Sequence, residues 1–285
     1  MLKLRILTAA CLLLLLIPPL LYPPLWAWRS VTLVLLAAAG WEWGRLNGLG
    51  QLGAWMSAFA CLLACVMAWD LGLADRPMTG FWVAAGSAWI LLGAALLKAG
   101  VASWSKLPQP VRLLGGLLAA WLTWLAAAHA HRIGAGFLIS VMALVWAADI
   151  GAYFAGRKWG GRWVAAKLAP SISPGKTWEG VLGGLVCVVA VAFVWRGLEL
   201  SGMVPGSSFM AYLSVGGGVF LMVLSLLLIT GMSVVGDLVE SLVKRSAGVK
   251  DSSQLLPGHG GVLDRIDALL PTLPLAMMLF ALSAR

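Results

Sequence analysis

Long intervals without a charged residue set the first constraint on this chain of 285 residues. Five of them are bounded by Arg5–Arg29, Arg45–Asp70, Arg76–Lys98, Arg112–Arg132 and Glu179–Arg196. A helix needs about 20 apolar residues to cross the hydrocarbon core of a bilayer. With 61% hydrophobic and only 11% charged residues, the chain lacks the charges that coat a soluble domain. The sequence therefore predicts an all-α, polytopic integral membrane protein.

Four further apolar segments raise the predicted number of spans to about nine, at about 31–47, 133–155, 209–235 and 268–284. The third of these is long enough for a span plus a broken segment at its run of three glycines, 216–218. If the N-terminus is cytoplasmic, fifteen of the twenty Lys and Arg residues lie on the cytoplasmic side, as the positive-inside rule expects. We expect N-terminal transmembrane helices over 1–132 (about five spans), and a catalytic region over 133–285 with cytoplasmic loops 156–177 and 236–266.

The net charge of +9 has to be interpreted for a membrane protein. Basic residues in cytoplasmic loops meet anionic lipid headgroups, and no soluble module that mixes basic and aromatic residues is visible. We therefore expect the lipid bilayer, and not nucleic acid, as the partner of this charge. The four cysteines lie in apolar stretches without a C-x-x-C pair, which predicts structural roles.

The segment 236–245 is densely polar. Asp237, Glu240, Ser241 and Lys244 are spaced i, i+3, i+4 and i+7, which places them on one face of a helix. A polar face at the end of a span is expected to contact protein or water and not lipid. The alternative is an interfacial helix whose charges simply reach water.

The segment 250–267 combines glycines, a histidine and acids. Glycines flank His259 and allow a tight backbone path, while Asp264 and Asp267 stand three residues apart where the last span begins. Two such acids suit a divalent cation or helix capping. Together with Asp237 they are interleaved with basic residues, a mixture that favours phosphates bridged by magnesium. The Cys and His spacing of a zinc site is absent.

A third polar segment, 171–180, precedes the seventh span. Lys176 and Thr177 follow a glycine as in a P-loop, but Pro170 stands where that motif needs its first glycine. What is left is a set of hydroxyls and one lysine at a helix N-terminus, which can bind an anion. The alternative is a capped helix start at Ser173.

Isolated charges within spans need partners because an unpaired charge is costly there. Asp149, at the end of the sixth span, is a candidate metal ligand or the partner of a basic residue. Glu42 is expected to form a structural pair with Arg45 at i+3. His129 and His131 are expected in an external loop, away from the site.

The segment 241–267 resembles the signature of the phosphatidate cytidylyltransferases (CDP-diacylglycerol synthases). The matching pattern is Ser241-x-Val243-Lys244-Arg245-x4-Lys250-Asp251-x-Ser253-x2-Leu256-Pro257-x-His259-Gly260-Gly261-Val262-x-Asp264-Arg265-Ile266-Asp267. The segments 149–157 and 173–180 also resemble this family, although some members carry a second lysine where this chain has Gly175. The resemblance implies transfer of the cytidylyl group of CTP to phosphatidic acid, giving CDP-diacylglycerol and pyrophosphate for phospholipid biosynthesis. It also implies a bacterial plasma (inner) membrane protein with a cytoplasmic active site.

The resemblance implies the following roles, in this chain's numbering. Asp237 and Asp264 are expected as principal ligands of Mg²⁺, with Asp149 and Asp267 as supporting acids. Asp237, Asp264, Lys244 and His259 are the expected catalytic residues. The expected substrate-binding residues are Ser173, Lys176, Thr177, Ser241, Arg245, Lys250, Gly260, Gly261 and Arg265. A second ion such as K⁺ and a homodimer are further implications.

Two other functions compete with this interpretation. A CTP-dependent lipid kinase is also a polytopic phosphoryl-transfer enzyme, but it releases CDP instead of pyrophosphate. A transporter predicts acids near the middle of the membrane, whereas most acids here lie at the predicted cytoplasmic ends of spans.

Overall fold

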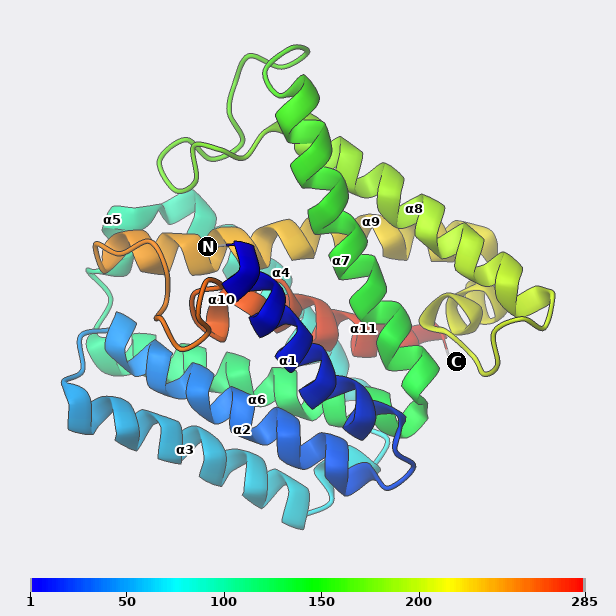
Figure 1. The fold of residues 1–285 in the computed structure, drawn as a ribbon, viewed down its shortest axis with the longest axis horizontal. Helices are drawn as coiled ribbons and strands as arrows, with labels where there is room; N and C mark the ends of the chain where they lie inside the picture. Colours follow the sequence, from blue (N-terminus) through cyan, green and yellow to red (C-terminus); the bar gives the residue numbers. More distant parts are fainter. Residues whose placement is uncertain (1, 284–285) are drawn as a thin grey trace.

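The computed structural model describes residues 2–283, and this part of the chain is helical, with no β-strand. Figure 1 shows the helices in the order α1 (Leu2–Leu21), α2 (Leu25–Leu46), α3 (Gln51–Asp70), the 3-10 turn η1 (Leu73–Asp75), α4 (Thr79–Ala99), α5 (Val101–Trp104), α6 (Gln109–Ile133), α7 (Ala135–Trp159), α8 (Trp178–Leu200), α9 (Phe209–Ser246), α10 (Leu263–Ile266) and α11 (Leu269–Ser283).

Within residues 2–283, eight helical segments are long and apolar enough to cross a membrane. They are α1, α3, α4, α6, α7, α8, α9 and the stretch Leu263–Ser283 that contains α10 and α11. The remaining expected span, at about 31–47, lies in α2, which has 22 residues but carries Arg29, Glu42 and Arg45. These charges explain why α2 is not among the eight. The all-α, multi-pass architecture predicted from the charge-free intervals is confirmed.

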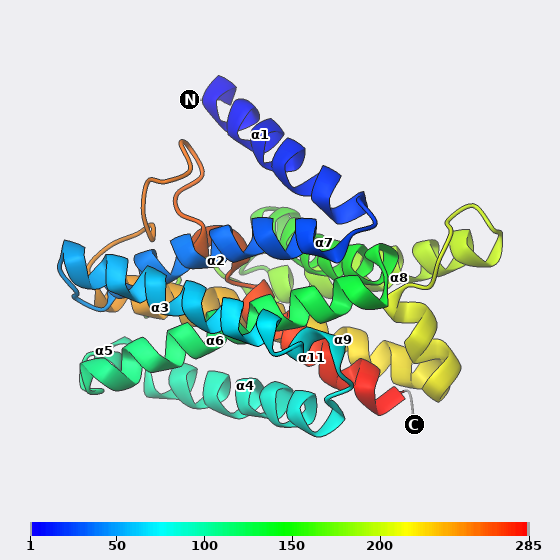
Figure 2. The same cartoon turned by 90° about the horizontal axis from the view of Figure 1, so that it is seen from below.

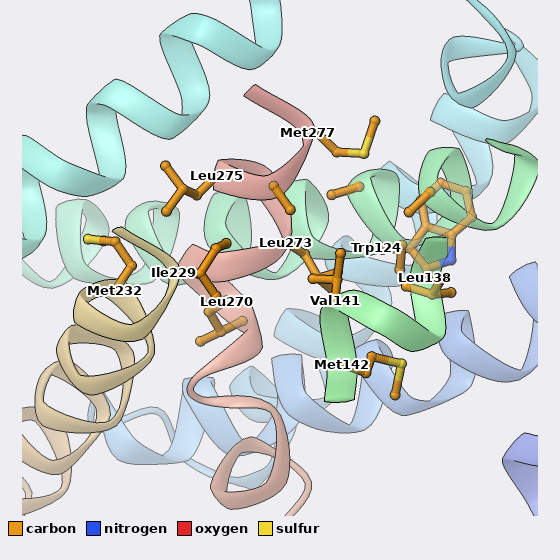
Figure 3. Packing of buried hydrophobic residues seen from close by; sticks show 14 of the residues in the cluster. Trp124, Leu138, Val141, Met142, Ile229, Met232, Leu270, Leu273, Leu275 and Met277 are labelled. Atoms are coloured by element: carbon orange, nitrogen blue, oxygen red, sulfur yellow. The ribbon is translucent and has the colours of Figure 1, made fainter. Parts of the chain in front are cut away.

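Helix α11 lies at the centre of the bundle. It packs against α4, α6, α7 and α9, and most of its side chains are buried. Figure 3 shows side chains of α11 among those of three of these neighbours: Leu270, Leu273, Leu275 and Met277 of α11, Ile229 and Met232 of α9, Leu138, Val141 and Met142 of α7, and Trp124 of α6. Because α10 leads directly into α11, the residues of α10 are anchored to the core of the protein.

Helix α9 is broken within its length of 38 residues. Gly218 has φ 71° and ψ −178°, a conformation that costs glycine little and other residues much more. The sequence leaves open whether this stretch is one span or a span plus a broken segment, and the structure shows the break at Gly218. At 1.5 Å per residue, α9 would otherwise be roughly 57 Å long, well beyond the hydrocarbon thickness of a bilayer.

The expected external loop around His129 and His131 is wrong. Both histidines lie in the last turns of α6 and are buried. His129 Nδ1 accepts a hydrogen bond from the Trp82 indole over 3.3 Å, and His131 Nε2 lies 2.9 Å from the carbonyl oxygen of Leu20. The sequence places these residues before Arg132, but only packing against α1 and α4 removes them from solvent.

Helix α1 lies on the outside of the bundle, as Figure 2 shows. Its inner side reaches the loop that joins α9 to α10, where the Thr8 hydroxyl donates to the carbonyl of Pro257 over 2.8 Å. This loop is therefore bounded by α1 on one side and by the bundle on the other.

Candidate active site

A cavity of about 420 Å³ lies between α7, α8, α9 and the loop 160–177. Its polar lining residues are Asp149, Tyr153, Arg157, Ser173, Lys176, Thr177, Thr230 and Asp237. The segments 149–157 and 171–180 thus meet here with Asp237, the first polar residue of the segment 236–245.

Glycines bring α7 and α8 together beside this cavity. A Cβ on Gly151 of α7 would lie 2.6 Å from the carbonyl oxygen of Gly183 of α8, and a Cβ on Gly184 would lie 2.7 Å from the carbonyl oxygen of Ala148. Neither distance is tolerated by a real side chain. The two helices can approach this closely only because these positions carry no side chain.

Lys176 and Asp237 form the central ion pair of the cavity. Lys176 Nζ lies 3.1 Å from Asp237 Oδ2, and the two side chains are 31% and 26% exposed. The pair connects the loop 160–177 to α9. Asp149 of α7 lines the same cavity, and its charge interacts with both residues. The two carboxylates of Asp149 and Asp237 and the ammonium group of Lys176 therefore face the same cavity, which is open to solvent.

The loop that carries Lys176 is held by its own backbone and by α8. The buried carboxylate of Glu179 accepts hydrogen bonds from the backbone N–H groups of Trp163 and Val164, over 2.9 and 3.0 Å. The Thr177 hydroxyl caps α8 by accepting from Gly180 N over 3.1 Å. The helix start is thus capped at Thr177 and not at Ser173, which leaves Ser173 and Lys176 on the cavity wall.

A second cluster of charges lies deeper, around Lys244. Its Nζ lies 2.6 Å from Asp264 Oδ1 and also pairs with Glu240. Lys244 and Glu240 are buried, so the alternative in which these charges simply reach water is wrong for both. In the part of the chain that the structure describes, Lys244 and Asp264 are not among the residues that line the 420 Å³ cavity.

Asp264 is also the anchor of the loop 250–262. Its Oδ2 accepts from Ser252 N, Ser252 Oγ and Gly261 N, over 2.9, 2.8 and 2.7 Å. Both carboxylate oxygens are therefore bonded to groups of the chain itself. The role of Asp264 as a metal ligand stays a prediction, and it requires Asp264 to exchange some of these contacts for the ion.

The expected pair of Glu42 with Arg45 is wrong. Glu42 is fully buried and accepts hydrogen bonds from Ser253 Oγ, Val262 N and Leu263 N, over 2.5, 2.9 and 2.7 Å. Arg45 is exposed and lies over the ring of Trp41, 4.7 Å from its centroid. A buried acid needs partners, but those of Glu42 are more than 200 residues away in sequence, where local spacing cannot find them.

The other predicted residues of 241–267 lie around the loop and not in the cavity. Arg245, Lys250 and Arg265 are exposed, Ser241 is half-buried, and Gly261 is packed against Glu42 and Ser252. Gly258 and Gly260 have φ of 77° and 81°, which confirms that the turn needs glycine on both sides of His259. Asp267 lies close enough to Asp237 and Asp149 for their charges to interact.

Two cavity residues were not predicted, although their spacing carries a signal. Tyr153 and Arg157 follow Asp149 at i+4 and i+8, which places all three on one face of α7. Arg157 donates to the Tyr153 hydroxyl over 3.0 Å. The arginine adds a second cation to the cavity wall beside Lys176.

The cavity offers the donors that magnesium uses. Among residues 2–283, no three His, Cys, Asp or Glu side chains converge on one point as a preformed metal site. Magnesium, however, keeps several waters and is commonly held by one or two carboxylates plus the phosphates of a substrate. Asp237 Oδ2 is buried without a well-oriented hydrogen bond, and Asp149 faces the same space. These residues fit a magnesium ion that arrives with a nucleotide.

Comparisons with known proteins identify a matching family and several relatives of this chain. A family model described as "Cytidylyltransferase family" matches residues 3–283. The chain is 39% identical over 252 residues to a phosphatidate cytidylyltransferase of Pseudomonas aeruginosa, an alignment that covers 87% of this chain and 85% of the relative. It is 36% identical over 259 residues to one of Brucella melitensis, covering 91% and 73%. A phosphatidate cytidylyltransferase of Haemophilus influenzae is 47% identical over 146 residues, which cover 51% of this chain and 46% of the relative.

Proposed function

Because the chain belongs to the cytidylyltransferase family, we propose that it transfers the cytidylyl group of CTP to phosphatidic acid, giving CDP-diacylglycerol and pyrophosphate. The observation that carries the proposal is the cavity in which Lys176, Asp237 and Asp149 meet between membrane-spanning helices. A nucleotide can reach such a cavity from water, and a phospholipid can reach it from the bilayer.

The reaction needs positioning and charge neutralisation more than it needs a base. A phosphate oxygen of phosphatidic acid attacks the α-phosphorus of CTP; the new P–O bond forms as the bond to the β-phosphate oxygen breaks, and pyrophosphate leaves. The nucleophile is already an anion, so no strong general base is required. Lys176 and Arg157 neutralise phosphate oxygens on the cavity wall, and alignment of the two phosphates supplies much of the rate.

Magnesium belongs to the proposal as the ion that accompanies CTP. Asp237 and Asp149 would hold it, with Asp267 close by and Asp264 available once its loop contacts rearrange. When bound, the ion would supply positive charge that offsets the negative charge on the leaving pyrophosphate. A second ion such as K⁺ is proposed for the same group of acids.

The cellular setting follows from the family and the helices. We propose a bacterial inner membrane protein whose active site faces the cytoplasm, where CTP is available. The bacterial relatives and the apolar helices support this placement. A homodimer is proposed from the resemblance, and its test is the molar mass of the purified protein in detergent.

A double-label experiment separates this reaction from that of a CTP-dependent lipid kinase. Purified protein is incubated with phosphatidic acid and CTP that carries one label in the cytosine ring and another in the γ-phosphate. Transfer of the cytidylyl group brings the ring label into the lipid phase and leaves the γ-label in water as pyrophosphate. The opposite distribution, with γ-phosphate on lipid and CDP in water, would contradict the proposal.

A further inference from the structure

Glu42 is a buried carboxylate outside the active-site cavity, for which the reaction above supplies no role. It lies on α2, in a part of the helix that packs against α3 and α6, and none of its surface is exposed. Burying a charge in such a place is costly unless hydrogen bonds compensate for it. The partners of Glu42 therefore show what its charge stabilises.

Three donors from one loop converge on this carboxylate. Oε1 accepts from Ser253 Oγ and Val262 N, and Oε2 accepts from Leu263 N. Leu263 is the first residue of α10, and N–H groups at a helix start have no partner within the helix. A negative charge at this end also suits the helix dipole. Glu42 thus fixes the point at which the loop enters α10.

The same contacts fix the glycine turn 258–261. A Cβ on Gly261 would collide with the Glu42 carboxylate, so the turn packs directly against it. The N–H of Gly261 donates to Asp264, and Asp264 in turn pairs with Lys244 of α9. A continuous set of contacts therefore runs from α2 through the turn and α10 to α9, on which Asp237 stands.

We propose that Glu42 is a positioning residue for the cytidylyl transfer, holding the glycine turn 258–261 and the start of α10 so that Asp264 stands against Lys244 of α9 and Asp267 stands against Gly236, next to Asp237. It touches no substrate and acts only through the loop. This inference rests on the proposed function for its kinetic consequences, whereas its structural consequence, an ordered loop, can be measured without any reaction.

The charge and the length of the side chain have separate consequences. In Glu42→Gln, one oxygen becomes an NH₂ group that faces N–H donors, so at least one hydrogen bond becomes a donor–donor contact. Glu42→Asp keeps the charge but shortens the side chain by one methylene group, so this variant should retain part of the activity. Ser253→Ala removes one of the three donors and leaves the carboxylate in place.

A matched control is available between the same helices. The buried Ser57 hydroxyl of α3 donates to the carbonyl of Gly40 on α2 over 2.7 Å, two residues from Glu42, and does not contact the loop. Ser57→Ala therefore removes a buried hydrogen bond to α2 without touching residues 252–263. It reports what a loss of stability alone does to the enzyme.

The experiment measures kcat and KM for CTP per folded enzyme, together with hydrogen exchange of residues 252–263. We expect Glu42→Gln to lower kcat/KM about a hundredfold, the size of loss that a misplacement of about 1 Å can cause. Exchange in 252–263 should rise at least about tenfold because one of the two bonded backbone N–H groups, that of Val262 or that of Leu263, loses its acceptor. Glu42→Asp and Ser253→Ala should fall between wild type and Glu42→Gln, and Ser57→Ala should match wild type in both measurements.

Two results would overturn the proposal. One is a kcat/KM per folded enzyme in Glu42→Gln that equals that of wild type, so that any loss of activity merely follows the folded fraction; the other is unchanged exchange in 252–263. If Glu42→Gln does not fold, the same measurements of kcat/KM and hydrogen exchange on Ser253→Ala test the proposal. If the wild-type protein transfers no cytidylyl group, the proposed function fails, while the exchange measurement still tests the contact itself.

Discussion

Replacement of Lys176 by Met separates the catalytic role of this residue from its role in folding. Charges 3.1 Å apart attract by about 5 kcal/mol at an effective dielectric constant of about 20. Desolvation and side-chain ordering offset most of this for a pair that is 31% and 26% exposed, which leaves a net contribution of about 0.2–1 kcal/mol to stability. The melting temperature should therefore fall by no more than about 4 °C.

The effect of Lys176→Met on activity should be much larger than this. The lysine is one of two cations on the cavity wall, and removal of one preorganised group that stabilises transition-state charge costs about 10²–10³ in rate. The assay is transfer of ring-labelled CTP into lipid at saturating phosphatidic acid, normalised to folded protein.

Arg196→Met provides the control away from the cavity: Arg196 is 25% exposed and pairs with Glu199 on α8, which is only 4% exposed but keeps two hydrogen bonds from Ser208 when the arginine is removed. It should change the melting temperature to a similar degree and leave kcat/KM unchanged. If Lys176→Met keeps kcat/KM within about threefold of wild type, the assignment of Lys176 to phosphate binding is refuted.

Further predictions concern Asp264, Gly261 and the ion pair of Arg29 with Asp75. Asp264→Asn should abolish nucleotide transfer and leave the helical content in detergent unchanged, and near-normal activity would contradict the prediction that it binds metal. Gly261→Ala should lower activity and melting temperature together because its Cβ collides with neighbouring side chains, whereas Gly115→Ala, with open space around it inside α6, should lower neither. The Arg29 guanidinium beside Asp75 lowers the pKa of the Asp75 carboxyl. The ionised Asp75 therefore stabilises the folded protein at pH values above the pKa that Asp75 has in the unfolded chain. This stabilisation is lost as the pH falls through the lower pKa that Asp75 has in the folded protein. Thermal melts between about pH 5 and pH 3 should then show a smaller pH dependence for Asp75→Asn than for wild type, and equal slopes would contradict this.

Local patterns were sufficient to predict much of the fold. The charge-free intervals correspond to helices because both the interval and the helix are set by the thickness of the bilayer. The break in α9 lies in the glycine run where the sequence allows one, since backbone freedom is a property of the residue itself. The grouping of Asp149 with Lys176 and Asp237 in one cavity agrees with the resemblance that connected their three segments.

Tertiary partners could not be predicted in the same way. Glu42 has Arg45 within one turn, and local spacing favours that pair, yet packing turns the carboxylate inward to a loop from the other end of the chain. Lys244 is an expected catalytic residue, and in the structure it pairs with Glu240 one helical turn away and with Asp264 of α10, a partner that spacing along one helix cannot indicate. In both cases, the choice depends on which helices become neighbours, and the sequence spacing contains no information on that.

The most direct test of the central claim counts both products in one reaction. Wild-type protein and Asp237→Asn, at equal amounts of folded protein, receive phosphatidic acid, Mg²⁺ and CTP that is labelled in the cytosine ring and in the γ-phosphate. We predict that wild type forms CDP-diacylglycerol and pyrophosphate in equal amounts, that chelation of Mg²⁺ stops both, and that Asp237→Asn forms neither at more than about a hundredth of the wild-type rate. Equal rates in the two proteins, or CDP in place of pyrophosphate, would contradict the account.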